Sequence, residues 1–284
     1  MLALDIRNVT KAYSDFQIKD VSFQLEQGYI MGFIGANGAG KTTTIKSILN
    51  MIRIDSGEVW IMGKNIAEHE IELKQDIGCA FGNTDFYTRS KIKTLTSITK
   101  RFYRRWSDET YYTYLKRFKL DENKKIAELS TGMKVKYNLT LALSHGAKLL
   151  ILDEPTSGLD PVSRDDLLTL FQELIAGGEI SILFSTHTTS DLEKCADFIT
   201  FINNGQIVDS SEKHHFVESY RLLGGSADQL HEVKEQLISY KVNAFGFTGL
   251  IHVKDFDPAS SLKATTPSLE EIMIYFAKKE DAHG

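Results

Sequence analysis

The sequence contains only two cysteines, Cys79 and Cys195, and they lie far apart in the chain. They form neither a CxxC pair nor any spacing typical of metal ligands. We therefore expect two buried, reduced thiols of a cytosolic protein rather than a framework of disulfide bonds.

The chain also lacks an excess of positive charge and a long apolar segment. Its 33 basic and 38 acidic side chains leave a net charge of −5, which disfavours a broad electrostatic attraction to nucleic acid. No apolar stretch is long enough to span a bilayer, and the N-terminus lacks the basic and apolar regions of a signal peptide. We expect no nucleic-acid partner, and any role at a membrane must come through another protein.

One glycine-rich stretch, residues 35–43, stands between an apolar run (residues 29–34) and an apolar pattern of helical spacing (residues 45–52). A strand, a glycine-rich turn and a helix in this order form a P-loop, in which successive backbone N–H groups point at an anion. Lys41 supplies a mobile positive charge, and the Thr42 hydroxyl can ligate Mg²⁺. The predicted nucleotide-binding residues are Gly35, Ala36, Asn37, Gly38, Ala39, Gly40, Lys41, Thr42 and Thr43.

Two carboxylates follow a second apolar run at residues 149–152. Such a run is typical of a parallel strand that is buried on both faces, and open α/β sheets bind their ligands at the carboxyl ends of these strands. Asp153 can hold Mg²⁺ through water, and Glu154 can take a proton from, or orient, the water that attacks a γ-phosphate. The alternative is an ordinary acidic surface loop, which the presence of a P-loop disfavours.

Two further candidates each have a plain structural alternative. His187 follows a predicted buried strand (residues 179–185), where it could donate to a γ-phosphate oxygen or be an ordinary hydrogen-bonded loop histidine. Tyr13 lies in the first turn, where it could stack on a purine or be a half-buried turn tyrosine. Asp160, which precedes Pro161, predicts the start of a helix.

The remaining patterns divide the chain into regions. Residues 2–33 alternate apolar and polar positions and predict an antiparallel sheet. Residues 100–106 interleave basic and aromatic side chains; they could bind RNA or single-stranded nucleic acid, but an amphipathic helix with buried aromatics suits an acidic chain better. Ser130 predicts the cap of a helix at residues 134–143.

Beyond about residue 215 the patterns indicate a small α+β unit, with the stretch at residues 220–225, a polar helix at about 229–238 and a strand at 250–253. Ser268 and Glu271 form a predicted capping box at the start of a final helix. One face of this helix is apolar and must pack on its own domain or on another subunit.

With the P-loop, the Asp153–Glu154 strand end and the Leu-Ser-Thr-Gly-Met stretch at residues 129–133 in this order, residues 2–210 resemble the ATP-binding subunit of an ABC transporter. The resemblance implies an α/β P-loop NTPase of the ABC ATPase type, with an N-terminal antiparallel β subdomain and a helical subdomain at about residues 86–146. The expected domains are an ABC ATPase domain, residues 1–215, and a C-terminal accessory domain of α+β type, residues 216–284.

The resemblance also assigns roles to single residues. Residues 35–43 look like the Walker A loop, and residues 149–154 look like Walker B ending in the catalytic Glu154. His187 is similar to the switch histidine, Tyr13 to the adenine-stacking aromatic, and Asp160 to the D-loop aspartate. The implied ligands are ATP and Mg²⁺, with Thr42 and Asp153 on the metal.

Two motifs depart from the family pattern. The signature motif usually reads Leu-Ser-Gly-Gly-Gln, but here Thr131 and Met133 replace a glycine and the glutamine, whereas Ser130 and Gly132 are kept. Ser130, Thr131 and Gly132 are therefore expected to complete the ATP site of a second subunit. At the Q-loop, Gly82 stands where the family has glutamine, and Asn83 follows it.

The resulting functional prediction is an ATPase that powers export through a separate integral membrane permease, from the cytoplasmic face of the membrane. It looks most like the bacterial ABC-2 exporters of peptides, toxins, antibiotics or polysaccharides. Its partner across the ATP sandwich is a second copy, forming a homodimer, or a paralogous ATPase. The alternatives are a soluble ABC-type ATPase that acts on DNA or the ribosome, and a nucleotide-binding regulator without efficient turnover.

Overall fold

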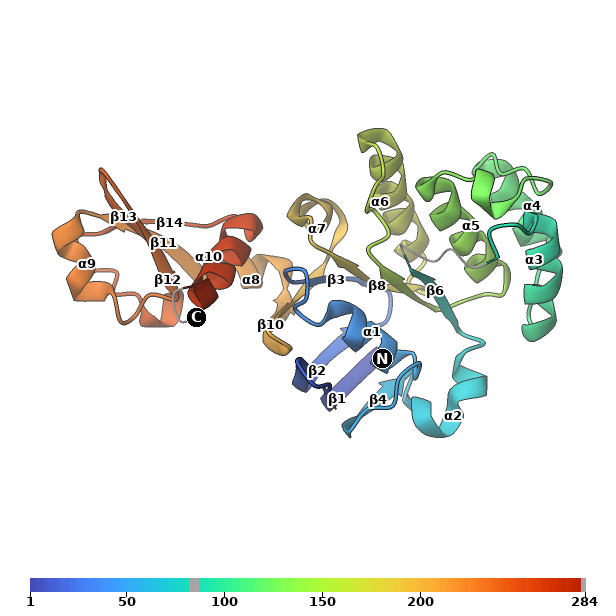
Figure 1. Ribbon diagram of the computed structural model, residues 1–284, viewed down its shortest axis with the longest axis horizontal. Coiled ribbons are helices and arrows are strands. Elements are labelled where there is room, and N and C mark those ends of the chain that lie inside the picture. The colour runs from blue at the N-terminus through green and yellow to red at the C-terminus, as the bar shows by residue number, and fades with distance from the viewer. Residues whose placement is uncertain (82–86, 282–284) are drawn as a thin grey trace.

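The computed structural model describes residues 1–81 and 87–281. Three β-sheets account for the strands of these residues, and helices cover the central sheet (Figure 1). The helical region lies at one end of the molecule and the C-terminal sheet lies at the other (Figure 1). The predicted α/β architecture is confirmed.

The first sheet is antiparallel and has the strand order β2-β1-β4-β5. Its strands alternate buried and exposed side chains, as in β2, because only one face packs on the core. Its strands are β1 (Leu2–Ala12), β2 (Gln17–Glu26), β4 (Ser56–Ile61) and β5 (Lys64–Asn65), and the helix α2 (Ile66–Leu73) follows them.

The central six-stranded sheet has the order β10-β9-β3-β8-β7-β6, and every pair except β9–β10 is parallel. All residues of β3, β7 and β8 are buried, as the continuous apolar runs predict. The prediction of an antiparallel sheet over residues 2–33 is wrong at residues 30–33, which belong to β3, because this run lacks the polar alternation of a half-exposed strand. The strands are β3 (Ile30–Ile34), β6 (Ile77–Phe81), β7 (Leu149–Asp153), β8 (Ser181–Thr186), β9 (Phe198–Asn203) and β10 (Gln206–Glu212).

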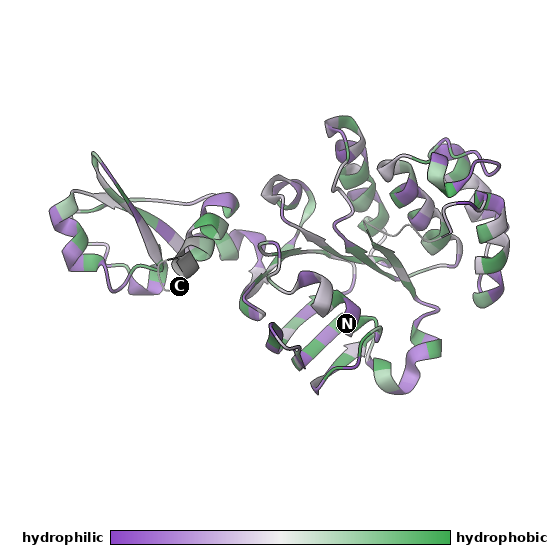
Figure 2. Cartoon of the chain, in the orientation of Figure 1, coloured by the Kyte–Doolittle hydropathy of each residue, from purple (hydrophilic) through white to green (hydrophobic). Residues whose placement is uncertain are grey.

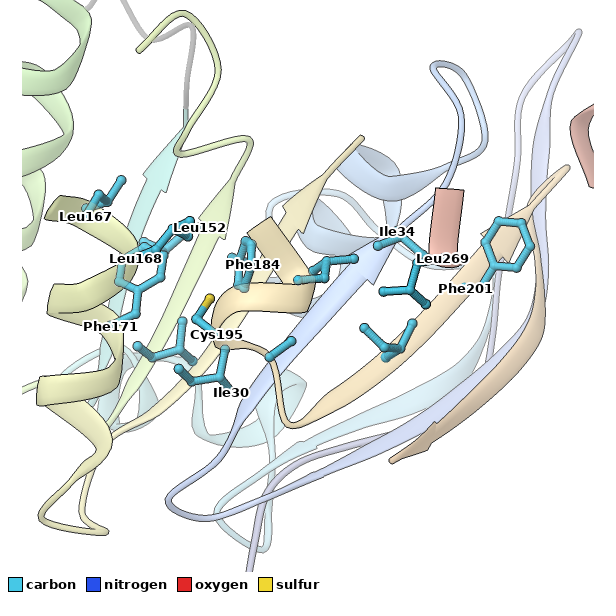
Figure 3. Packing of buried hydrophobic residues seen from close by; sticks show 14 of the residues in the cluster. Ile30, Ile34, Leu152, Leu167, Leu168, Phe171, Phe184, Cys195, Phe201 and Leu269 are labelled. Carbon is cyan, nitrogen blue, oxygen red and sulfur yellow. The ribbon is translucent and has the colours of Figure 1, made fainter. Parts of the chain in front are cut away.

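Two hydrophobic cores lie on the two faces of this sheet. One holds α1 (Lys41–Ile48) between the central and the N-terminal sheets. The other is formed with α5 (Thr131–Ser144), α6 (Pro161–Ile175) and α7 (Thr189–Cys195). In Figure 3, Phe171 and Leu167 of α6 lie against Leu152 of β7, and Phe184 of β8 lies close by. In Figure 2 the central strands are largely hydrophobic, whereas hydrophobic and hydrophilic bands alternate along the helices.

The helical region comprises α3 (Ile92–Thr99), α4 (Asp108–Arg117) and α5, with short 3₁₀ turns at Lys100–Phe102 and Ile126–Glu128. Ser130 caps α5 and its hydroxyl accepts from Met133 N, which confirms the predicted cap. The amphipathic helix predicted at residues 100–106 is wrong, because the chain makes only one 3₁₀ turn there. Phe102 is 71% exposed, and Tyr103 stacks on His145 of the adjoining loop instead.

The C-terminal sheet is antiparallel, in the order β12-β13-β11-β14, and carries α9 and α10. The capping box of α10 is present, since Ser268 N donates to Glu271 Oε2 at 2.8 Å and Glu271 N donates to Ser268 Oγ at 3.2 Å. The helix predicted to reach residue 238 ends at Val233. The elements are α8 (Lys213–Glu218), β11 (Tyr220–Gly225), α9 (Ala227–Val233), β12 (Ser239–Asn243), β13 (Gly246–His252), a 3₁₀ turn (Val253–Asp255), β14 (Lys263–Thr265) and α10 (Leu269–Asp281).

The apolar face of α10 packs on two parts of its own chain. The helix contacts β12 and β13 on one side and α7 on the other. Its Phe276 ring lies edge-on to Phe201 of β9, with centroids 5.2 Å apart, and to Tyr220 of β11, at 5.8 Å. Phe216 of α8 completes this aromatic cluster. The cluster therefore joins the C-terminal sheet to the central sheet.

The two cysteines differ in exposure. Cys195 is buried, as predicted, whereas Cys79 is exposed, so the prediction of a buried thiol is wrong at this position. Cys79 belongs to β6, which is the edge strand of the central sheet, and its neighbours Gly78 and Ala80 are the buried residues. Alternation along the strand therefore directs Cys79 away from the side that Gly78 and Ala80 share.

Candidate functional site

The glycine-rich loop makes the turn that sequence analysis predicts between β3 and α1. Gly40 precedes α1 with φ +112°, a conformation that side chains rarely adopt, and a Cβ there would lie 2.9 Å from Ile18 Cγ2. A Cβ on Gly35 would lie 2.5 Å from the Ile202 carbonyl oxygen. Both positions therefore require glycine, and the loop is held tightly against its surroundings while the first N–H groups of α1 point out of the helix.

Lys41 is buried at the base of this loop. Its ammonium group donates to the carbonyl oxygens of Gly35 at 2.8 Å and Ala36 at 3.2 Å. It also lies 3.5 Å from Glu154 Oε1. The charge is thus fixed between the loop and the end of β7, and a phosphate in the loop would be a stronger acceptor than these neutral carbonyls.

Asp153 connects the loop to the central sheet. Thr42 Oγ1 donates to Asp153 Oδ2 at 2.8 Å, and Ser185 Oγ donates to Oδ1 at 2.6 Å. Sequence analysis missed Ser185, which is itself fully buried. The register of the parallel sheet could have identified Ser185, because this residue is paired with Asp153 across β7 and β8.

Glu154 stands in an unusual backbone conformation directly after β7. Its φ of +52° is uncommon for a residue other than glycine, and such strained residues cluster at functional sites. Its N–H is held by Ser185, with the hydroxyl at 3.0 Å and the carbonyl at 3.2 Å. This arrangement directs the carboxylate back toward Lys41 rather than into solvent, and its side chain is only 22% exposed.

His187 lies beside Glu154, as its place at the end of β8 suggests. His187 Nδ1 is 2.8 Å from Glu154 Oε2, and because a carboxylate accepts, Nδ1 carries the proton. The structure brings Lys41, Thr42, Asp153, Glu154 and His187 into one group; their catalytic roles stay predictions.

Tyr13 lines a cavity of about 420 Å³ beside the glycine-rich loop. The ring is 50% exposed and Lys11 Nζ lies 5.7 Å from its centroid. Phe16, which sequence analysis missed, lines the same cavity and reaches Gly40, where its Cζ would lie 3.1 Å from a Cβ. Two aromatic rings next to a phosphate-binding loop suit the stacking of a flat base. Phe16 is therefore a second candidate for the base-stacking role that the sequence predicts for Tyr13.

The signature residues lie at the N-terminus of α5, where Ser130 is exposed. Among the described residues, no hydrogen bond or ion pair joins Ser130, Thr131 or Gly132 to the glycine-rich loop. Gly132 instead lies against the segment that follows Glu154, since a Cβ on it would be 3.1 Å from Leu159 Cδ2. Their place in the ATP site of a second subunit stays a prediction.

Asp160 caps α6, and its carboxylate accepts from Val162 N and Ser163 N at 3.0 Å each. The Ser163 hydroxyl and amide lower the pKa of Asp160 and keep it ionised. Its predicted D-loop role stays a prediction. Gly82 and Asn83, the Q-loop candidates, lie outside the described residues.

The donor set fits ATP with Mg²⁺. Mg²⁺ takes oxygen ligands, keeps several waters and binds through one or two protein groups together with substrate phosphates. Thr42 Oγ1 and Asp153 Oδ2 offer two such oxygens within 2.8 Å of each other at the mouth of the loop. The first N–H groups of α1 and the Lys41 ammonium are the donors that the loop offers to the phosphates.

Comparison with known proteins supplies the family. The family model described as ABC transporter matches residues 18–157. The chain is 33% identical over 284 residues to the ABC transporter ATP-binding protein YtrB of Bacillus subtilis (strain 168), covering 95% of this chain and 97% of that protein. It is 32% identical over 217 residues to the bacitracin transport ATP-binding protein BcrA of Bacillus licheniformis, covering 75% and 71%.

Two further matches agree with these. The Nod factor export ATP-binding protein I of Burkholderia orbicola (strain AU 1054) is 32% identical over 226 residues, covering 76% of this chain and 73% of that protein. A solved ATP-binding subunit of an ABC transporter superposes with a TM-score of 0.68 at 26% identity, covering 75% of this chain and 91% of that chain.

Proposed function

Because the chain belongs to the ABC transporter family of ATP-binding proteins, we propose that it is the ATP-hydrolysing subunit of an exporter and acts on a separate integral membrane permease. The observation that carries this proposal is the group formed by Lys41, Asp153, Glu154 and His187 at the mouth of a P-loop. No helix of the described residues is both long and apolar enough to cross a membrane. The substrate pathway is therefore assigned to the permease.

The proposed chemistry is hydrolysis of the γ-phosphate. The loop N–H groups and Lys41 bind the phosphates, and Thr42 and Asp153 hold Mg²⁺, which when bound neutralises charge on the β- and γ-phosphates. Glu154 accepts a proton from the attacking water, and the His187 ring, fixed by its hydrogen bond to Glu154, donates to the γ-phosphate. Tyr13 and Phe16 stack on the base.

The site is completed by a second subunit, either another copy or a paralogous ATPase. Ser130, Thr131 and Gly132 are available for contacts outside their own P-loop, which suits a two-fold sandwich in which each signature helix caps the partner's ATP. ATP closes this dimer, and hydrolysis removes the contacts of the γ-phosphate, so the dimer opens. The cycle would drive a permease from the cytoplasmic face of the membrane.

The names of two relatives support a proposal for the class of cargo. One relative is named for bacitracin transport and another for Nod factor export. We assign this chain to export of a peptide, an antibiotic or a similar compound. An ABC-type ATPase acting on DNA or the ribosome, and a regulator without turnover, are the competing functions.

Glu154→Gln tests the chemistry. The amide cannot accept the proton, so the variant should bind ATP, accumulate a closed dimer and lose hydrolysis, as measured by phosphate release and by sedimentation with MgATP. Glu173→Gln changes an exposed glutamate that pairs with Arg117 on the surface, and it should behave as wild type. Wild-type turnover by Glu154→Gln would remove Glu154 from the general-base role.

Co-purification in mild detergent tests the partner. A polytopic membrane protein that elutes with the chain supports the exporter. Elution with ribosomes or DNA would overturn it, and absence of ATPase activity in the wild-type protein with its membrane partner would favour the regulator.

A further inference from the structure

Asp191, on α7, is a buried carboxylate that lies behind the site and takes no part in the proposed chemistry. It is 1% exposed and makes three side-chain contacts. Thr156 Oγ1 donates to Asp191 Oδ2 at 2.7 Å, Thr186 Oγ1 lies 3.4 Å from the same oxygen, and Arg164 Nε forms an ion pair with Oδ1. A buried carboxylate is costly unless it is paired in this way, and these three contacts together satisfy both oxygens of Asp191.

The partners of Asp191 flank the two proposed phosphate-sensing residues. Thr156 follows Glu154 by two positions, and Thr186 directly precedes His187. Thr186 Oγ1 also accepts from Thr188 N at 3.0 Å, which fixes the chain on the other side of His187. One carboxylate therefore holds the segments that carry both members of the Glu154–His187 hydrogen bond.

The same segment reaches the signature residues. Three positions beyond Thr156, Leu159 lies against Gly132, with Cδ2 at 3.1 Å from the place of a Cβ. In the proposed dimer, Glu154 and His187 act on the nucleotide of their own chain, whereas Gly132 contacts that of the partner. Residues 156–159 thus connect the parts of one chain that face two different ATP molecules.

We propose that Asp191 is a positioning residue that couples these two ATP sites, by tying residues 156–159 to the end of β8. The inference rests on the proposed function. When the signature end binds the partner's ATP, the displacement of Leu159 passes through Thr156 and Asp191 to the Glu154–His187 pair. Each subunit then reaches its hydrolytic geometry only when both nucleotides are in place.

Asp191→Asn is the direct test, because it keeps the size of the side chain but turns one of the two acceptor oxygens into an NH2 donor. The contacts with Arg164 on one oxygen and with Thr156 and Thr186 on the other therefore cannot all persist. ATP hydrolysis by the purified protein with its membrane partner should show a kcat about tenfold lower, since lost supporting contacts around a site cost at least this much. KM for ATP should stay within about twofold, and the Hill coefficient should fall toward 1. If Asp191 had only a structural role, the variant would give less folded protein, but the folded fraction would keep the wild-type kcat, KM and Hill coefficient.

The chain offers a matched control on the same two helices. Asp165 of α6 forms an exposed ion pair with Lys194 of α7. Asp165→Asn removes a bridge between α6 and α7 but touches neither residues 156–159 nor the end of β8, so it should keep the wild-type kcat and Hill coefficient. An equal loss in Asp165→Asn would overturn the coupling role.

Thr156→Val is the second test, for the case that Asp191→Asn does not fold. This variant removes the hydrogen bond from residue 156 to Asp191 but keeps the ion pair between Asp191 and Arg164. Its kcat should fall with an unchanged KM, and in a double variant the two losses should not multiply, since both remove one connection. Wild-type kcat and Hill coefficient in Thr156→Val or in Asp191→Asn would refute the inference alone. Failure of the wild-type protein to hydrolyse ATP would refute the proposed function as well.

Discussion

Ser185 supports both acidic residues of the site, and its replacement by alanine shows how firmly Asp153 must be held. Its hydroxyl donates to Asp153 at 2.6 Å and accepts from Glu154 N at 3.0 Å. In the variant, Glu154 N keeps the carbonyl of residue 185 as an acceptor, at 3.2 Å. Ser185→Ala therefore removes chiefly one buried hydrogen bond to a carboxylate, which contributes about 1.5–3 kcal/mol.

Two consequences are expected from Ser185→Ala. The free energy of unfolding should fall by about 2 kcal/mol, which lowers Tm by about 3 °C in a protein of this size. Among the residues that the structure describes, Asp153 then keeps the hydrogen bond from Thr42 and loses its second side-chain support, so the Mg²⁺ concentration for half-maximal ATPase activity should rise about tenfold. The assays are thermal unfolding and a Mg²⁺ titration of phosphate release at saturating ATP.

A second buried serine provides the control. Ser144 lies on α5 and donates to the Thr140 carbonyl at 2.6 Å, away from the site. Ser144→Ala loses a neutral hydrogen bond of about 1 kcal/mol and should leave the Mg²⁺ dependence unchanged. The reasoning fails if Ser185→Ala keeps the wild-type Mg²⁺ dependence, or if Ser144→Ala shifts it equally.

Three further predictions follow from the contacts above. Lys41→Ala should weaken ATP binding by about 10- to 100-fold in calorimetry, because a charge-assisted hydrogen bond is lost, and unchanged affinity would refute the P-loop assignment. Burial lowers the pKa of His145 to about 4, whereas in the unfolded chain the ring takes up a proton near pH 6.5. The free energy of unfolding should therefore fall by about 3 kcal/mol as the pH is lowered from 6.5 to 4. Unfolding curves at several pH values measure this loss, and His145→Asn should flatten it. Phe276→Ala should cost about 2 kcal/mol and speed hydrogen exchange in β11 and β13, and equal exchange in both proteins would contradict the role of the aromatic cluster.

The features that sequence analysis predicted are those encoded by neighbouring residues. The P-loop is a strand, a turn and a helix in direct succession, and Asp153–Glu154 marks the end of an apolar run. The contacts of Glu154 with Lys41 and His187 join three separate segments, but each segment ends a predicted parallel strand or begins the helix after one. The sequence could therefore predict that the segments of Lys41, Glu154 and His187 meet at one edge of the central sheet.

Other features depend on pairings that no short pattern encodes. Ser185 is one polar position within a buried strand, and only the register against β7 brings it to Asp153. Phe16 reaches the glycine-rich loop through the packing of β2. Residues 100–106 carry a mixture of charge and aromatics that suits a helix, but the chain turns there to place Tyr103 on His145. Tertiary contacts outweigh local preference in these places.

The shared aromatic cluster bears on how this chain could be divided. A fragment that stops near residue 215 would lose Phe216, Tyr220 and Phe276, and Phe201 of β9 would meet water in their place. The same β9 pairs with β3, which leads into the glycine-rich loop. A chimera that joins the C-terminal sheet to a related ATPase would thus need a phenylalanine at the position of Phe201 as well. A junction placed at α8, between the two sheets, would separate residues that share one hydrophobic core.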